Sequence, residues 1–275
     1  MVDQCKQMDG VRTLVVGASS GIGRAFAIAA RENGARVAVA ARRMSVLNPL
    51  AVMLGGTAHE LDVTNPEAID RVVREAAEAL GAIDAVFFSS VVVPLARVEH
   101  VDAVTWAEAF AVNATGPALV MRAVLPYLSD DAVILIASDG VGTPRAGIAA
   151  YSASKAALDE ILRSWRCEHP DLAVIRVGIG PTDETEIFRG ADEDMLGEFF
   201  DLWTRRGQVP EKMSRVTDVA NTMVSVISAA RSSATLVTEI VHLAPRSSKK
   251  KSSAVTVPDE RAPADRRAAT LPVDQ

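Results

Sequence analysis

Residues 11–23 read VRTLVVGASSGIG, an apolar run that breaks into a turn of small residues at Gly17. The amphipathic segment 24–33 follows, so this stretch predicts a strand, a tight turn and a helix. Glycines at positions 17, 21 and 23 leave the turn without side chains where a ligand would approach. Backbone N–H groups at the positive end of the helix dipole suit an anion such as a diphosphate.

Outward from this stretch, short apolar runs alternate with segments of helical periodicity. Further strands are predicted at 35–41, 57–63, 84–90, 131–137, 172–177 and 235–243. Helices are predicted at 44–54, 65–80, 101–128, 149–168 and 217–230, with perturbations at Pro49, Pro117 and Pro126. The strands are apolar throughout, which is typical of a parallel sheet covered by helices on both faces. We therefore expect an α/β fold with a doubly wound parallel sheet of about seven strands.

Four segments are expected along the chain. Residues 1–10 are polar and should be loose, residues 11–244 should form one domain, and the acidic stretch 183–214 should form a lid. Residues 245–275 are rich in Ser, Pro, Lys and Arg and lack aromatic residues, so we expect a disordered tail, with an interaction arm as the alternative. The lid aromatics Phe188, Phe199, Phe200 and Trp203 are interpreted either as an apolar contact surface or as the core face of a short helix.

The composition excludes several classes of protein. A net charge of −6 argues against a general nucleic-acid binder, which needs a basic surface. Two cysteines far apart make no disulfide framework, so a cytoplasmic location is expected. The polar N-terminus predicts no secretory signal, and no uninterrupted apolar run is long enough to cross a membrane. No metal site is predicted.

The end of the second predicted strand bears on the dinucleotide that such a turn can hold. An acid there would bind the ribose hydroxyls of NAD, whereas an arginine would pair with a 2′-phosphate. The strand ends in Ala41, Arg42 and Arg43, without a carboxylate. Arginine matches phosphate oxygens bidentately, so the sequence favours NADP(H) over NAD(H). Solvated surface arginines, and with them NAD use, are the alternative.

Asp62 and Val63 end the third predicted strand. The Asp62 carboxylate can accept from an adenine amino group while Val63 covers the ring. Alternatively, Asp62 caps the following helix.

Ser138, Tyr151 and Lys155 form a second group. Tyr151 and Lys155 lie four residues apart on a predicted helix and share a face, and Ser138 follows the fifth predicted strand, at the edge where such sheets bind ligands. A phenol has an unperturbed pKa near 10, and a nearby ammonium favours its phenolate. Tyr151 can then exchange a proton with a substrate oxygen that Ser138 positions while a cofactor exchanges hydride. A surface lysine, a core tyrosine and a loop-capping serine are the alternatives.

Together these motifs make the chain resemble a classical short-chain dehydrogenase/reductase over residues 11 to about 243. GASSGIG resembles that family's cofactor turn, and Ser138, Tyr151 and Lys155 have its Ser…Tyr-x-x-x-Lys spacing. The resemblance implies a single-domain Rossmann-type fold. It also implies that Asn113 holds a helix irregularity and a proton-relay water, and that Lys155 binds the cofactor ribose.

The resemblance implies the remaining contacts as well. The expected cofactor-binding residues are Gly17, Ser19, Ser20, Gly21, Ile22, Gly23, Arg42, Arg43, Asp62, Val63, Ser89, Ser90, Tyr151, Lys155, Pro181 and Thr182. A homodimer or homotetramer through the helices near 101–128 and 150–168 is implied too.

Three positions depart from the family pattern. Val16 replaces a threonine, Phe88–Val91 replaces Asn-Asn-Ala-Gly, and Thr182 replaces a common glycine. The expected function is an NADP(H)-dependent oxidoreductase that interconverts a carbonyl and an alcohol on a small molecule. A dinucleotide-binding sensor or scaffold without turnover, or an NAD-dependent dehydrogenase, are the alternatives.

Overall fold

The computed structural model describes residues 6–138, 144–233 and 239–244, all within one compact unit that ends at residue 245. The tail predicted at 245–275 lies outside the described residues. Residues 6–10, expected to be loose, instead join the fold. Met8 is fully buried and its N–H donates to the carbonyl of Asn33 at 3.0 Å, because its apolar side chain extends the core beyond the first strand.

Seven parallel strands form one sheet in the order β3-β2-β1-β4-β5-β6-β7, as predicted from the alternating pattern. Their bounds are β1 Arg12–Val16, β2 Arg36–Ala41, β3 Thr57–Glu60, β4 Ile83–Phe88, β5 Leu128–Ser138, β6 Ala173–Ile179 and β7 Glu239–Leu243. The strand order reverses between β1 and β4. A sheet of this kind binds its ligand in the crevice above that switch point.

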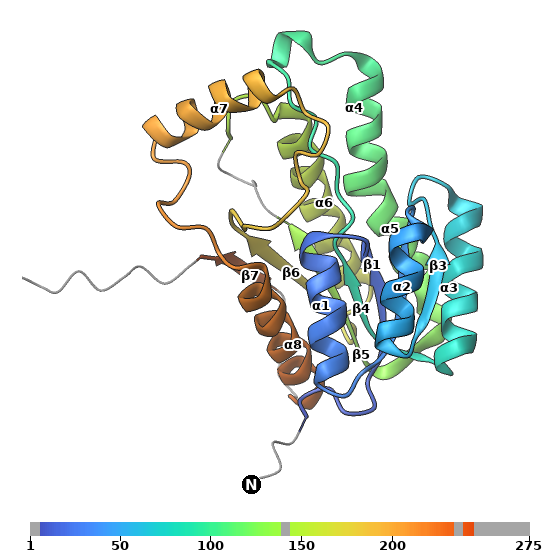
Figure 1. The fold of residues 1–275 in the computed structure, drawn as a ribbon. Helices are drawn as coiled ribbons and strands as arrows, with labels where there is room; N and C mark the ends of the chain where they lie inside the picture. The colour runs from blue at the N-terminus through green and yellow to red at the C-terminus, as the bar shows by residue number, and fades with distance from the viewer. Residues whose placement is uncertain (1–5, 139–143, 234–238, 245–275) are drawn as a thin grey trace, which may run out of the picture. The chain divides into compact units, whose positions relative to one another are not determined.

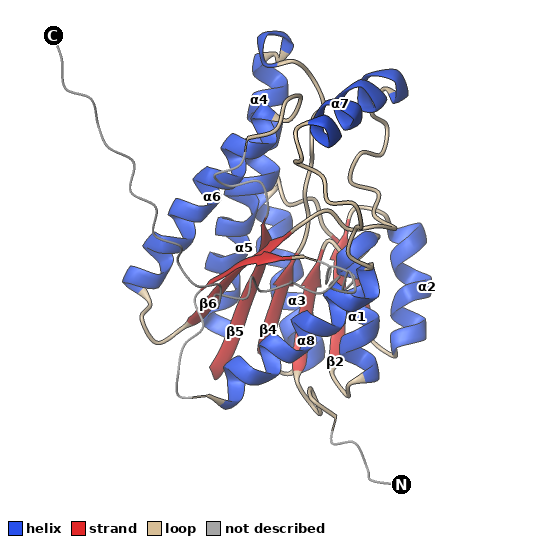
Figure 2. Ribbon diagram, turned by 90° about the vertical axis from the view of Figure 1, so that its left-hand side faces the viewer, coloured by secondary structure: helices blue, strands red, loops and turns tan. Residues whose placement is uncertain are grey.

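Helices cover both faces of the sheet (Figure 1). One face carries α1 Gly21–Glu32, α2 Met44–Leu54 and α8 Val216–Ser232, and the other carries α3 Pro66–Leu80, α5 Gly116–Val124 and α6 Ala149–Glu168. Figure 2 shows the strands between these two layers, with α4 Ala103–Phe110 and α7 Glu193–Arg205 extending beyond one end of the sheet. Both cores follow the two-residue alternation of the strands: Val15 and Phe87 face α1 and α8, whereas Val16 and Phe88 face α3 and α5.

The long helix predicted at 101–128 is divided. After α4 a π-helical turn, Ala111–Thr115, precedes α5, and a 3-10 turn, Leu125–Tyr127, ends the run at Pro126. Pro117 stands in the first turn of α5, directly after the π-helical turn. By length and hydropathy the stretch Ala103–Tyr127 is apolar enough to cross a membrane, but half of its most apolar part is buried within the fold, as in the core helix of a globular protein.

Three smaller points concern the end of β3, the stretch 183–214 and Pro49. The third strand ends at Glu60, so Asp62 lies in the loop after it and not at its last position. The stretch 183–214 includes α7, whose side chains Phe199 and Trp203 are buried. Pro49 lies inside α2 without ending it.

Candidate active site

The turn after β1 lies directly against the end of β4. Gly17 has φ +91°, and a Cβ there would come 2.5 Å from the backbone nitrogen of Ser90, so only glycine fits. The Ser89 N–H donates to the carbonyl of Val16 at 2.9 Å, and the Ser89 hydroxyl is 3.3 Å from the same oxygen. Ser89 thus ties together the two strand ends at the switch point, where the family pattern has asparagine.

Helix α1 begins at this turn with an open N-terminus. Ser20 is its N-cap residue, but the Ser20 side chain accepts no hydrogen bond from the first turn, and that turn contains no acidic residue. The N–H groups of the first turn have no partner within a helix. Together with the helix dipole they form an anion site of the kind that holds a diphosphate.

One cavity of about 890 Å³ starts at this turn and extends past the ends of β2, β4, β5 and β6. Its lining includes most of the residues predicted to bind a dinucleotide, namely Gly17, Ser19, Ser20, Gly21, Ile22, Gly23, Arg42, Arg43, Asp62, Val63, Ser89 and Ser90. Ser138, Tyr151 and Lys155 line the same cavity. Two groups of residues far apart in the sequence therefore share one site.

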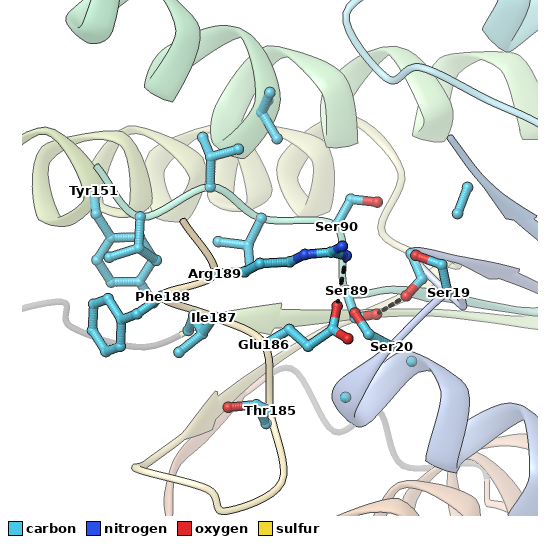
Figure 3. Close-up of a pocket in the computed structure, with 18 of the residues that line it drawn as sticks. Ser19, Ser20, Ser89, Ser90, Tyr151, Thr185, Glu186, Ile187, Phe188 and Arg189 are labelled. Atoms are coloured by element: carbon cyan, nitrogen blue, oxygen red, sulfur yellow. Dashed lines mark hydrogen bonds and ion pairs between the residues drawn. The ribbon is translucent and has the colours of Figure 1, made fainter. Parts of the chain in front are cut away.

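The two arginines after β2 differ in their surroundings. Arg42 is exposed. Arg43 donates to the hydroxyl of Ser19 at 3.1 Å and forms an ion pair with Glu186 at 2.9 Å. Glu186 also pairs with Arg189 at 3.3 Å, and Figure 3 shows both side chains on the loop after β6, facing Ser89 and Ser90. The hydrogen bond from Arg43 lowers the pKa of Glu186.

Asp62 is engaged with its own loop. Its Oδ1 accepts from the N–H of Thr64 at 2.9 Å and from the Thr64 hydroxyl at 2.7 Å, and the backbone hydrogen bond is the main cause that lowers its pKa. The cap of α3 is Asn65, which accepts from the N–H of Ala68 at 2.9 Å. Asp62 therefore shapes the turn before the cap, with Val63 beside it in the cavity lining.

Ser138 is the last residue of β5 and is 3% exposed. Among the described residues its Oγ has no hydrogen-bond partner, although it is buried and lines the cavity. A buried hydroxyl without a partner costs free energy unless a ligand satisfies it. The arrangement thus leaves one hydrogen-bonding group ready for a polar atom of a bound molecule.

Tyr151 and Lys155 lie on the first turns of α6 and are almost completely buried. The Lys155 ammonium is 6.0 Å from the centre of the Tyr151 ring and donates to the carbonyl of Ala137 at 3.2 Å. Ala137 precedes Ser138 on β5, so this hydrogen bond joins α6 to the strand that carries the serine. The three side chains are held at one end of the cavity.

Asn113 does not line the cavity but hydrogen-bonds Val92, a residue that does. It lies fully buried in the π-helical turn, accepts from the N–H of Val92 at 2.9 Å and donates to the carbonyl of Val92 at 2.8 Å. It also donates to Ser154 Oγ at 3.0 Å, and Ser154 donates to the carbonyl of Tyr151 at 2.7 Å. Asn113 is thus a positioning residue, and its part in a proton relay stays a prediction.

Pro181 and Thr182 are absent from the cavity lining. The Pro181 carbonyl accepts from the N–H of Ser214 at 3.0 Å, and the Thr182 hydroxyl donates to the carbonyl of Gly180 at 2.9 Å. This pair stabilises the start of the loop after β6. Their predicted contact with the cofactor stays a prediction.

Sequence reasoning missed Glu186, Arg189 and Ser154. The two loop residues come from a stretch without periodicity, so nothing local links them to Arg43. Sequence reasoning also missed the valines at 91–93, which line the cavity. Their position directly after a predicted strand could have indicated this, since an apolar segment at the carboxyl edge of a parallel sheet borders the ligand crevice.

Comparison with known proteins agrees with this geometry. A family model described as short chain dehydrogenase matches residues 12–196. A sorbitol dehydrogenase from Cereibacter sphaeroides is 32% identical over 179 residues, covering 63% of this chain and 68% of that enzyme. A short chain dehydrogenase from Pseudocercospora fijiensis is 32% identical over 201 residues, covering 69% of this chain and 64% of the relative.

A solved structure is similar over nearly the whole described fold. The short-chain type dehydrogenase/reductase from Mycobacterium marinum has a TM-score of 0.74 and 25% identity, and the match covers 88% of this chain and 97% of that one. The matched family model, the related enzymes and the shared sheet lead to one conclusion: this chain belongs to the short-chain dehydrogenase/reductase family of NAD(P)-dependent oxidoreductases.

Proposed function

We propose that the protein is an NADP(H)-dependent oxidoreductase that interconverts a ketone or aldehyde and the corresponding alcohol. The observation that carries the proposal is the single cavity that joins the turn at Gly17 and Arg43 to the group of Ser138, Tyr151 and Lys155. A phosphate site and an acid/base group in one cavity fit a dinucleotide and a small substrate bound side by side.

The cofactor's diphosphate would lie at the open N-terminus of α1, against the glycines of the turn. A 2′-phosphate on its adenosine ribose would meet Arg43 and Arg42 after β2, a strand that ends without a carboxylate of its own for the ribose hydroxyls. This is the support for NADP(H) over NAD(H). When bound, the cofactor supplies or accepts the hydride at the substrate carbon.

Side chains of the protein transfer the proton to and from the substrate oxygen. Tyr151 donates its phenolic proton to the carbonyl oxygen during reduction and takes it back during oxidation. The Lys155 ammonium favours the phenolate that remains, because opposite charges attract strongly in a buried site. The Ser138 hydroxyl, which has no hydrogen-bond partner among the described residues, donates a hydrogen bond to the same substrate oxygen and fixes its position.

The proton role is tested with Tyr151→Phe, which removes the acidic hydroxyl and little else. We expect NADPH-dependent carbonyl reduction to fall by at least about a hundredfold, the lower range for general acid catalysis, while NADPH binding changes little. Tyr127→Phe is the matched control, since Tyr127 lies in the 3-10 turn after α5 and does not line the cavity. Near wild-type reduction by Tyr151→Phe would refute the assignment.

Two expectations from the sequence stay predictions here. The family resemblance implies a homodimer or homotetramer, and α4 carries exposed apolar side chains, Val104 at 76% and Phe110 at 37% exposure. Light scattering after size exclusion gives the mass in solution.

A cytoplasmic location is likewise proposed from the cysteine content.

A further inference from the structure

The end of the cavity around Tyr151 has an apolar wall that comes from the segment after β4. Val91, Val93 and Leu95 pack with Tyr151 in one cluster, whereas Val92 between them packs into the core beneath the sheet. Asn113 imposes this alternation, because it hydrogen-bonds both the N–H and the carbonyl of Val92. Val91, Val93 and Leu95 therefore form one row of apolar side chains beside Tyr151 in the cavity lining.

The opposite wall comes from the loop after β6. Phe188 and Ile187 line the cavity, and Figure 3 shows the Phe188 ring beside Tyr151. Phe188 is held by Trp203 of α7, with ring centres 6.0 Å apart, and the Trp203 indole donates to the carbonyl of Ala146 at 2.9 Å. The aromatic residue at the substrate end is thus supported by a packed helix.

Three charged residues of the lining are directed away from Tyr151 or exposed on the surface, whereas Lys155 lies beside the Tyr151 ring. Figure 3 shows the Arg189 guanidinium directed toward Ser90 and Glu186, away from Tyr151. Asp192 is exposed and caps α7 by accepting from the N–H of Met195 at 2.8 Å, and Glu108 is exposed on α4. Ser138 and Lys155 line the cavity with Tyr151 and already have roles in the proposed reaction, whereas the side chains of Val91, Val93, Leu95 and Phe188 carry no polar atom.

We propose that the substrate is an apolar ketone or secondary alcohol whose carbonyl carbon carries an aryl ring or a long alkyl group. This inference rests on the proposed carbonyl–alcohol reaction. An aryl group gains apolar contact with Val91, Val93 and Phe188. The hydroxyls of a ketose, or the carboxylate of an oxoacid, would lose water there without finding partners.

The first experiment compares NADPH oxidation with acetophenone, fructose and pyruvate under the same conditions. Fructose is the ketone that corresponds to sorbitol, so it also tests the activity named for one relative. We expect kcat/KM for acetophenone to exceed that for fructose and pyruvate by on the order of a hundredfold. Equal or faster reduction of fructose or pyruvate would overturn the inference and leave the proposed reaction standing. Reduction of none of the three, with NADPH still bound, would refute both.

The second experiment places a polar atom in the apolar wall. Val93→Thr keeps the shape of the side chain and adds a hydroxyl, and we expect it to lower kcat/KM for acetophenone about tenfold, mainly through KM. The Kd of NADPH should not change, because Val93 lies at the other end of the cavity from Arg43. Val52→Thr is the control, since Val52 is 82% exposed on α2. Unchanged acetophenone kinetics in Val93→Thr would contradict an apolar subsite at this wall.

Discussion

At the scale of single residues, Arg43 has two competing partners. In the described structure its guanidinium holds the carboxylate of Glu186, a residue of the loop after β6. A 2′-phosphate would use the same guanidinium. Binding of NADP(H), as proposed, would therefore have to release Glu186 or share Arg43 with it.

Glu186→Gln should strengthen NADPH binding roughly threefold, because it removes an acid that competes for Arg43 in a partly exposed ion pair. NADH binding should change less, since it brings no 2′-phosphate. Glu184→Gln is the control for the change in net charge. Fluorescence titration of both cofactors gives the Kd values, and an equal shift for NADH and NADPH would exclude direct competition.

Arg43→Ser should weaken NADPH binding about tenfold or more while leaving NADH binding nearly unchanged, because a charge-assisted hydrogen bond to phosphate is lost. Arg36→Ser is the control, since Arg36 begins β2, whose other end leads to Arg43, and does not line the cavity. The same titration measures both variants. A wild-type protein that binds NADH more tightly than NADPH would refute the preference itself.

At the scale of elements, the π-helical turn Ala111–Thr115 connects the segment after β4 to helix α6. Asn113 of this turn hydrogen-bonds Val92 on one side and Ser154 of α6 on the other. Helical periodicity alone predicted one long helix here, because the periods of α and π turns differ too little to be read from a few residues. Gly116 follows the turn and packs closely, with a Cβ there only 3.0 Å from the carbonyl oxygen of Val63. This close approach and Pro117 place the interruption next to the cavity, where π turns often mark functional sites.

Asn113→Ala should lower kcat for carbonyl reduction and destabilise the fold by about 2–3 kcal/mol, since it leaves the N–H and carbonyl of Val92 without partners. Asn65→Ala removes the cap of α3 at a cost of about 1 kcal/mol and is the structural control. Both are assayed well below their melting temperatures, with melting followed by circular dichroism. An activity loss no larger in Asn113→Ala than in Asn65→Ala would show that Asn113 acts on stability alone.

At the scale of the whole described fold, a network of ion pairs lies at the amino-terminal ends of the central strands, at the end of the sheet opposite the cavity. Asp84 of β4 accepts from the N–H of Arg12 at 2.8 Å and from its guanidinium at 2.6 Å, and Arg231 of α8 pairs with Asp131 of β5 at 2.7 Å. Burial by itself would raise the pKa of Asp84, but the hydrogen bonds from Arg12 and the nearby Arg231 hold it well below its usual range.

A lowered pKa in the folded state means that ionised Asp84 stabilises the fold above its unfolded pKa near 3.9, and that this contribution is lost as pH falls toward the folded pKa. Asp84→Asn should therefore cost about 3 kcal/mol at pH 7 and less at pH 3. Urea unfolding at both pH values measures the difference. If the difference in unfolding free energy between wild type and Asp84→Asn were as large at pH 3 as at pH 7, this account would be contradicted.

The sequence by itself determined the class of fold, the positions of most elements and the residues Gly17, Arg43, Ser138, Tyr151 and Lys155 as members of one site. These follow from short-range rules: burial of apolar runs sets the strands and helices, and parallel strands bring their carboxyl ends to one edge. Only the tertiary structure decided that Glu186 reaches Arg43, that Asn113 orients Val92 and that Phe188 lies beside Tyr151. Such contacts join segments far apart in the chain, and they depend on how packed helices and loops settle against one another, which local periodicity does not encode.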